Sequence, residues 1–348
     1  MKKNILVIGA SGSLGFEICR SLHKVFDEKV TVLVGDYRKE RGPKTVERLE
    51  KLEIAAKFIY TDFSEYKSLD DAINQPLDCV IVAVKQNKPV LQELCSIYSI
   101  PCIDLTAYGS FTNFVENVLP NNGAPSIMMA GFFPGLSGVL VHSAVSDFSE
   151  IQQVKVNLVQ NKNAQVGLSG IEDMLKIIHQ PVGDAAHGFR EVETINIKQR
   201  TFKIRKIAHD EGAVLDEKLG IGLPTYQTGW NQNGFNHLVS FLLEYGLAEP
   251  LLKIAKKLKL KFNARHNDER VYLEVEASGI KFQEQTTEKI QIEATSNYGI
   301  TADFCALVTK KILNNRAIKG VKYPFQFMGL EVLDQLAQLG QLKKIIPA

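Results

Sequence analysis

The chain has 348 residues, with 41 Lys and Arg against 39 Asp and Glu, and therefore a formal net charge of +2. Hydrophobic residues make up 45% and charged residues 23%, as in ordinary globular proteins. Binding to the phosphate backbone of nucleic acids needs a clustered excess of Lys and Arg, so the balanced charge predicts no nucleic-acid partner. No run of about 18 apolar residues occurs. We therefore expect no membrane span, no signal peptide and a cytoplasmic location.

The five cysteines are sparse, odd in number and mostly set in apolar segments. This pattern is typical of reduced core residues in a cytoplasmic protein. None of them has the spacing of zinc ligands, so the sequence predicts no metal site.

Short apolar runs alternate with helical patterns over the first 130 residues. The apolar runs are continuous, which predicts strands buried on both faces, at 4–9, 30–35, 57–60, 78–84, 101–106 and 126–130. Amphipathic stretches lie between the first five, at 13–26, 44–53, 66–74 and 88–98. This alternation predicts an α/β domain with a Rossmann-type parallel sheet over residues 1–130.

Strict alternation of apolar and polar residues replaces the continuous runs in the second half. The segments 271–277 and 290–294 show it most clearly and predict half-exposed antiparallel strands, with further strands at 154–159, 191–197 and 201–207. Helical patterns follow at 170–179, 235–247 and 249–259. We expect a second, α+β domain over 131–299, built on a mostly antiparallel sheet. Helices in the C-terminal segment 300–348 can pack on either domain, including back on the Rossmann domain.

The first strand leads directly into GASGSLG, which places three glycines three residues apart. In dinucleotide-binding folds such glycines allow a tight turn, a close approach of backbone to pyrophosphate and close packing of helix on strand. The position between the first strand and the first helix of an α/β run makes the pattern specific. We expect it to bind a dinucleotide through Gly9, Ser11, Gly12, Ser13, Leu14 and Gly15.

The residues after the second strand, Asp36-Tyr37-Arg38-Lys39, bear on the choice of cofactor. An acid at this place holds the ribose 2′-hydroxyl of NAD, whereas Arg or Lys accommodates the 2′-phosphate of NADP. Asp36 and Arg38 therefore favour opposite answers, and Arg38 also suits a solvated loop. The wide spacing of the glycines favours NADP, and NAD is the alternative.

Two further strand ends should line the same crevice, because open α/β sheets bind ligands at the carboxyl ends of their strands. Asp62 and Phe63 follow the third strand and can line the adenine site, although Asp62 also suits the start of a helix. Ala83 and Val84 end the fourth strand, where small residues admit a cofactor. Lys85 comes next, as a candidate catalytic residue or as the solvent-facing end of the strand.

Several of these segments together resemble the NADP-binding domain of the saccharopine dehydrogenase family, including its short bacterial members. They are the glycine loop, TDFSEYKSLDDAI, DCVIVAV, LQELCSIYSIPCIDLTAY and AGFFPGLSG. The resemblance is clearest over residues 4–145, and the tail NYGITADFCALVTKKILNNRAIKGVKYP resembles the C-terminal helix and turn of the family. It implies an NAD(P)-dependent oxidoreductase, since most members act on a carbon–nitrogen bond of amino-acid or polyamine adducts.

One loop departs from the family pattern. Lysine-pathway enzymes commonly carry an acid before the Pro-Gly of this loop, which here is Gly-Phe-Phe-Pro-Gly at 131–135. An apolar loop makes saccharopine, which has several carboxylates, a less suitable substrate. Phe133 is a candidate substrate contact, and a plain turn between domains is the alternative.

Hydride transfer needs positioning and one proton donor or acceptor from the protein, because the cofactor carries the hard step. Asp104 heads the candidates, since IDL resembles the strand end of the family and an acid there faces the crevice. Asp104 can equally cap the following loop through backbone amides. Tyr108 and Lys85 are the other two candidates.

The second domain contributes GLPTYQTGWNQNG, which contains Tyr226 and the only tryptophan, Trp230. The segment is rich in Gly and Asn and reads as a loop too polar for the core. Such a loop can form a substrate wall, and a surface turn is the alternative.

Three functions are compatible with the sequence. The first is an NAD(P)-dependent oxidoreductase that transfers hydride to or from a C–N or C=O centre of a small amino- or keto-acid-like substrate. The second is a non-catalytic NADP(H)-binding redox sensor or scaffold, and the third is a reductase of an apolar, lipid-like substrate. A short-chain reductase is disfavoured because no tyrosine is followed four residues later by lysine. An antiparallel sheet with an open face also favours a homodimer.

Overall fold

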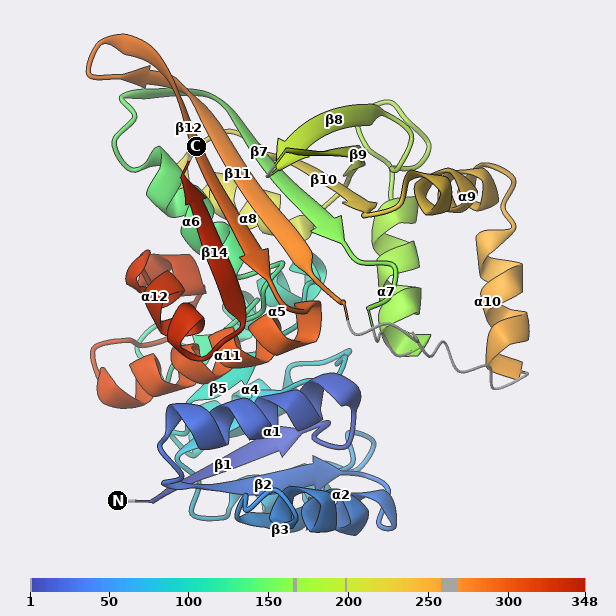
Figure 1. The fold of residues 1–348 in the computed structure, drawn as a ribbon. Coiled ribbons are helices and arrows are strands. Elements are labelled where there is room, and N and C mark those ends of the chain that lie inside the picture. Colours follow the sequence, from blue (N-terminus) through green and yellow to red (C-terminus); the bar gives the residue numbers. More distant parts are fainter. Residues whose placement is uncertain (1, 165–167, 198, 258–267, 348) are drawn as a thin grey trace. The chain divides into compact units, whose positions relative to one another are not determined.

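The computed structural model describes residues 2–164, 168–197, 199–257 and 268–347, which form two compact units (Figure 1). Residues 1–139 and 298–341 make up the first unit, and residues 140–297 and 342–348 make up the second. The first boundary falls inside helix α6 (Leu136–Val145), so the turn at 131–135 belongs to the first unit.

The first unit is built on a seven-stranded, wholly parallel sheet in the order β13-β6-β5-β4-β1-β2-β3. This confirms the predicted Rossmann-type sheet. Its strands are β1 (Lys3–Ile8), β2 (Val30–Asp36), β3 (Ala56–Tyr60), β4 (Cys79–Val82), β5 (Cys102–Asp104), β6 (Ser126–Ile127) and β13 (Val321–Lys322). Ile8 is level with Gly35 of β2 and Val82 of β4, so three carboxyl ends meet at one edge.

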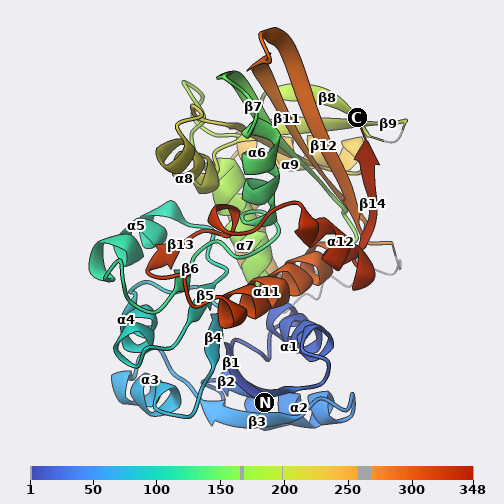
Figure 2. The same ribbon diagram turned by 90° about the vertical axis from the view of Figure 1, so that its left-hand side faces the viewer.

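Helices cover both faces of this sheet (Figure 2). Helices α3 (Tyr66–Ile73) and α4 (Val90–Ile97) pack on one face, where their leucines and isoleucines join apolar side chains of β1, β2 and β4. On the other face, α11 (Asn297–Asn314) lies against α1 (Ser13–Val25), and Lys310 donates a hydrogen bond of 2.9 Å to the Val25 carbonyl. The unit also contains α2 (Arg41–Glu50), α5 (Gly109–Val118), a short 3₁₀ turn (Pro324–Gln326) and α12 (Glu331–Gln338).

The second unit is built on a mostly antiparallel sheet in the order β14-β12-β11-β7-β10-β9-β8, as the alternation predicted. Strands β7 and β10 are its parallel pair, and β11 and β12 form the long hairpin drawn in orange in Figure 1. The strands are β7 (Glu150–Gln160), β8 (Val192–Ile197), β9 (Arg200–Ile207), β10 (Thr225–Trp230), β11 (Val271–Lys281), β12 (Glu284–Ala294) and β14 (Leu342–Pro347). The helices are α7 (Leu168–His179), α8 (Asp210–Leu219), α9 (Asn233–Glu244) and α10 (Ala248–Lys257).

The segment expected to be an exposed loop around Tyr226 and Trp230 is strand β10, so that expectation is wrong. Tyr226 is 2% exposed and Trp230 is 4% exposed, and the Trp230 ring contacts Phe189. Several of the polar groups that made the segment resemble a loop have partners within the sheet, although Gln227 Oε1 has none among the described residues. Gln227 donates to Glu193 at 2.8 Å, and the Thr228 hydroxyl donates to a backbone carbonyl at 3.1 Å. Tyr226 and Trp230 therefore belong to the core and do not form an exposed wall.

Within the residue ranges that the structure describes, no helix is long and apolar enough to cross a bilayer. The same ranges contain no group of three His, Cys, Asp or Glu side chains that could hold a metal ion. All five cysteines are free thiols and buried.

Candidate functional site

The turn between β1 and α1 is tightly packed and depends on its glycines. Gly9 has a φ of +87°, where a side chain is strained, and a Cβ there would lie 2.5 Å from Val84 Cγ1. A Cβ at Gly15 would overlap the carbonyl oxygen of Gly9. Gly12 is the N-cap of α1 and donates its amide to the Gly9 carbonyl at 2.9 Å. Gly9 and Gly15 are therefore required by their surroundings, whereas a Cβ at Gly12 would meet only the Gly9 carbonyl, at 3.2 Å. Close approach of a pyrophosphate to Gly12 stays a prediction.

Helix α1 begins at Ser13 and presents its N-terminus beside this turn. The first-turn amides of a helix, here including Ser13 and Leu14, have no acceptor within the helix. Together with the helix dipole they form a ready anion site, suited to a pyrophosphate.

A cavity of about 300 Å³ lies at the carboxyl ends of β1, β2, β3 and β4. Its lining includes Gly9, Asp36, Thr61, Phe63, Val84 and Lys85. The structure thus brings together candidates that are far apart in the sequence. The buried hydroxyl of Thr61, in the lining of this cavity, has no hydrogen-bond partner among the described residues. The glycine turn, the helix N-terminus and this hydroxyl together fit a dinucleotide.

Asp36 ends β2 with its carboxylate almost completely covered. Oδ1 accepts the backbone amide of Arg38 at 2.9 Å, and Oδ2 accepts Arg41 Nε at 2.7 Å. Burial alone would raise the pKa of Asp36, but Arg41 and the Arg38 amide hold it below its usual value. The Ser11 hydroxyl also favours the charged form, although it makes no hydrogen bond of normal geometry. Asp36 is therefore a carboxylate that Arg41 neutralises.

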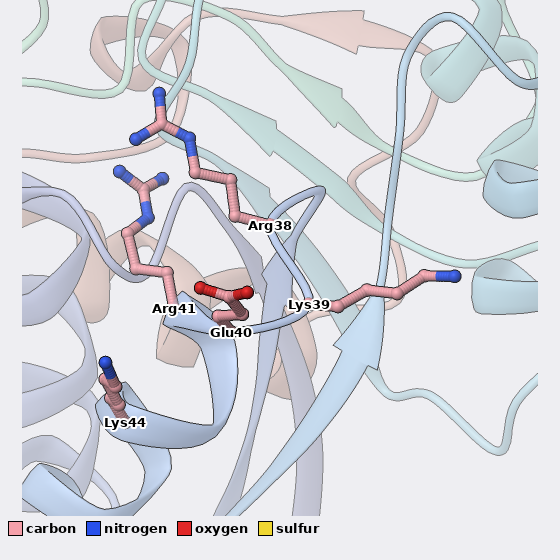
Figure 3. A pocket seen from close by; sticks show the side chains of 5 residues that line it. All are labelled: Arg38, Lys39, Glu40, Arg41 and Lys44. Carbon is pink, nitrogen blue, oxygen red and sulfur yellow. The ribbon is translucent and has the colours of Figure 1, made fainter.

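The side chains of Arg38 and Lys39, which lie shortly after Asp36, point in different directions. Arg38 Nε donates to the Tyr37 hydroxyl at 2.8 Å, whereas the Lys39 ammonium lies 4.8 Å from the Tyr60 ring centroid. Figure 3 shows Arg38 and Arg41 directed to the same side of the loop and Lys39 directed away. The sequence had named Arg38 but not Arg41, whose relation to Asp36 depends on how α2 begins.

Asp62 and Phe63 both line the cavity after β3. Asp62 also accepts hydrogen bonds from the Ser64 amide at 2.9 Å and hydroxyl at 2.7 Å. These bonds lower the pKa of Asp62. Phe63 is 38% exposed and offers a flat apolar surface at the cavity. The helix-start alternative for Asp62 is wrong, because α3 begins at Tyr66 with Glu65 as its N-cap. Asp62 instead shapes the turn before the helix and lines the cavity, and its contact with an adenine stays a prediction.

At the end of β4, two of the three candidate catalytic residues lie together. The Lys85 ammonium is 4.2 Å from the centroid of the Tyr108 ring. Ala83 and Val84, directly before Lys85, are half-buried beside the glycine turn, as expected for residues that admit a cofactor. The pair Lys85 and Tyr108 therefore places an ammonium and a phenol at the edge of the cavity.

Asp104, the leading candidate for proton transfer, is completely buried. Its Oδ2 accepts the amides of Gln86 and Gln92, both at 2.7 Å, and its Oδ1 accepts the Thr106 amide at 2.7 Å. Burial raises the pKa of Asp104 to about 6, although bonds from Thr106 and the two glutamines oppose this. This geometry favours the loop-capping alternative for Asp104.

The turn at 131–135 is tightly folded. Gly135 has a φ of +125°, and the Gly131 amide donates to the Pro134 carbonyl at 3.1 Å. Phe132 points into the core with 1% exposure, whereas Phe133 is half-buried. Contact between Phe133 and a substrate stays a prediction.

The second unit contains a polar residue that the sequence analysis missed. Arg205 in β9 is 2% exposed, and its Nε and Nη1 have no hydrogen-bond partner. Its Nη2 lies 3.5 Å from His237 Nδ1, and its guanidinium lies 5.0 Å from the Phe189 ring centroid. Burial lowers the pKa of Arg205, and no carboxylate of the described residues offsets the cost. The sequence feature that could have revealed this buried residue is an arginine inside the run TFKIRKI, at a position that shares a face of the strand with Ile207.

No family model matches the sequence. No curated protein matches it either. Among solved structures, apo histidine-tagged saccharopine dehydrogenase (L-Glu forming) from Saccharomyces cerevisiae is similar over 99% of this chain and 100% of its own, with a TM-score of 0.68 and 12% identity. C. glutamicum DAP dehydrogenase in complex with DAP aligns over 97% of this chain and 98% of its own, with a TM-score of 0.48 and 11% identity. At 12% identity the likeness to the first structure concerns the fold alone: the chain has a saccharopine dehydrogenase-like fold, as its motifs predicted.

Proposed function

We propose that this protein is an NADP(H)-dependent oxidoreductase that acts on a small amino- or keto-acid-like substrate. The observation that carries the proposal is the glycine turn between β1 and α1, which sets the N-terminus of α1 beside a cavity of about 300 Å³ at the carboxyl ends of β1 to β4. A helix N-terminus at this edge of a parallel sheet is where the pyrophosphate of a dinucleotide binds. The fold shared with saccharopine dehydrogenase supports the same reaction class.

The residues at the cavity divide into those that bind and those that can move a proton. Gly9, Gly12 and the N-terminus of α1 would hold the pyrophosphate, and Phe63 would pack against the adenine. The nicotinamide, once bound, supplies the hydride. Tyr108 would exchange a proton with the reacting nitrogen or oxygen of the substrate. Lys85, beside the ring, would favour the phenolate left after Tyr108 gives up its proton.

The test combines cofactor binding with turnover. Purified protein is titrated with NADPH and NADH by nicotinamide fluorescence, and oxidation of the bound cofactor is then followed with keto acids plus amines. Uncharged ketones and acyl substrates serve as controls. Turnover that requires the carboxylate supports the proposal. Tight cofactor binding without turnover on any substrate class would favour the redox sensor or scaffold, and turnover of acyl substrates alone would favour the apolar reductase. Absence of binding at about 100 μM, well above common working concentrations, would refute all three.

A further inference from the structure

An acidic residue stands at the position that selects NAD in many folds of this type, yet its surroundings do not suit that role. A ribose hydroxyl can donate to such an acid only if the carboxylate is open to the cofactor cavity. The Asp36 side chain is 1% exposed, while that of Arg41, which covers it, is 40% exposed. The carboxylate already accepts two hydrogen bonds, from Arg41 Nε and the Arg38 amide. A ribose would meet Arg41 before Asp36.

Arg41 also lines two pockets of the first unit. It lines the cavity that holds Asp36, Thr61 and Phe63. It equally lines a second pocket of about 520 Å³, together with Arg38, Lys39, Glu40 and Lys44 (Figure 3). Arg41 binds Asp36 through Nε, so its two terminal nitrogens are not used in that bond. In Figure 3 they lie beside the Arg38 guanidinium, and Lys44 lies along the same helix.

We propose that the Asp36–Arg41 pair is the device that selects NADP over NAD in this chain: Asp36 fixes Arg41, and Arg41, with Arg38 and Lys44, binds the 2′-phosphate. This inference rests on the proposed function, which it deepens. Asp36 is a positioning residue in this arrangement. It does not contact the ribose, although its position in the sequence suggests that it does.

Charge and geometry both support this assignment. The 2′-phosphate is a compact anion with three acceptor oxygens, and guanidinium groups bind such anions through paired, charge-assisted hydrogen bonds. An arginine already held by a carboxylate loses less side-chain entropy when the ligand arrives. The second pocket has four cationic side chains and one carboxylate, Glu40, so an anion is attracted to it. NADH has no 2′-phosphate to bind these cations.

The experiment compares four ligands, NADPH, NADH, 2′,5′-ADP and 5′-AMP, with wild type and four variants. Wild type should bind NADPH at least tenfold more tightly than NADH, and 2′,5′-ADP more tightly than 5′-AMP. Arg41→Ala should weaken NADPH and 2′,5′-ADP by about 10- to 100-fold, the range for hydrogen bonds to a charged group. It should leave NADH unchanged or tighter, because Asp36 becomes open. Lys44→Ala should weaken only the 2′-phosphorylated ligands, by several-fold.

Asp36→Asn distinguishes the two roles that Asp36 could have, positioning Arg41 or binding the ribose hydroxyls. If Asp36 positions Arg41, this isosteric variant weakens NADPH and spares NADH. If Asp36 holds the ribose hydroxyls, it weakens NADH instead, and the inference is overturned. Lys51→Ala is the matched control, because it removes the same charge from an exposed lysine at the other end of α2 and should change no affinity.

Failure of this inference is distinguishable from failure of the proposed function. Equal binding of NADPH and NADH that Arg41→Ala does not alter overturns the selectivity device and leaves the oxidoreductase proposal intact. Selective binding of 2′,5′-ADP by a protein that transfers no hydride supports the device and refutes the reaction. If no phosphorylated ligand binds, both are refuted.

Discussion

The ammonium group of Lys85 lies 4.2 Å from the centre of the Tyr108 ring, although the two residues follow different strands of the parallel sheet. Lys85 comes three residues after the end of β4, and Tyr108 comes four residues after the end of β5. A cation over an aromatic face is attracted by the ring. The contact therefore holds a phenol and an ammonium at the edge of the cavity, where the proposed hydride transfer would require the exchange of a proton.

Replacing Tyr108 by Phe tests whether the phenol moves that proton. The ring and its contact with Lys85 are kept, so folding should be unchanged, while kcat should fall by about 10²- to 10⁴-fold. The measurement is steady-state turnover together with NADPH affinity, which should stay within about twofold of wild type. Full activity of the variant would show that another group, such as a bound water, supplies the proton.

Gly15→Ala tests the close packing of α1 on the first turn. A helical glycine normally gains stability on replacement by alanine, by about 1 kcal/mol. Here the new Cβ would overlap the Gly9 carbonyl, so we expect a loss of about 1–3 kcal/mol and a large loss of cofactor affinity. Urea denaturation and fluorescence titration check the two effects. Gly234→Ala, where a Cβ meets nothing within 4 Å, is the control and should not destabilise the protein.

The raised pKa of Asp104 predicts how stability depends on pH. Its folded pKa is about 6, above the usual value near 3.9, so between pH 4 and 6 the folded chain keeps a proton that the unfolded chain has released. The stabilisation is complete below pH 4 and is lost as the pH rises through 6. Its contribution is about 2–3 kcal/mol.

Asp104→Asn should remove this contribution, so the free energy of unfolding of the variant relative to wild type should rise between pH 4 and 6. The variant should fold, because Gln86 Oε1 and Gln92 Oε1 are buried acceptors without a partner and either amide can turn to accept the new NH₂ group. Urea denaturation at pH 4, 5, 6 and 7 gives the difference. A constant difference across this range would mean that Asp104 stays ionised in the folded protein.

Trp230→Ala distinguishes a core residue from a residue of an exposed wall. Because Trp230 is 4% exposed and packs against Phe189 and Phe235, its loss should cost about 3–5 kcal/mol of stability. Leu223→Ala, at a side chain that is 72% exposed in the same segment, should change stability by less than about 0.5 kcal/mol. Similar small effects of both variants would contradict the burial described for β10.

Arg205→Met tests whether the buried cation in β9 lowers stability. The free energy of unfolding should be unchanged or higher, because a buried cation without a carboxylate partner is replaced by an apolar side chain of similar length. Urea denaturation gives the difference. Arg190→Met, which removes an exposed arginine paired with Glu244, is the control and should lower stability by less than about 1 kcal/mol. A clear loss of stability in Arg205→Met would show that its contacts with His237 and Phe189 outweigh the cost of the buried charge.

The sequence predicted best the features that depend on residues close together in the chain. The turn at Gly9 needs a positive φ, and Gly15 needs a missing side chain, so both glycines are visible in the sequence itself. The parallel strands are continuous apolar runs because helices cover both faces of their sheet. The alternation of apolar and polar residues in β11 and β12 likewise reflects a sheet whose two faces have different surroundings.

The elements that it missed depend on partners far along the chain. Gln227 in β10 looks like a loop residue until Glu193 of β8 is placed beside it. Arg41 appears as one more surface charge, and only the start of α2 brings its Nε to Asp36. Asp104 has the sequence position of a crevice residue, but two glutamines from the preceding loop and helix enclose it. No local pattern encodes such pairings.

Strand β13 pairs with β6, although about 190 residues separate them, and most of the second unit lies in that interval. Strand β14 then joins β12 in the other sheet. During synthesis the first sheet therefore cannot acquire its last strand until residue 322 has left the ribosome. The edge of β6 is exposed until then, and unpaired edges invite association between chains. A fragment that stops after the first 139 residues would keep that edge open permanently.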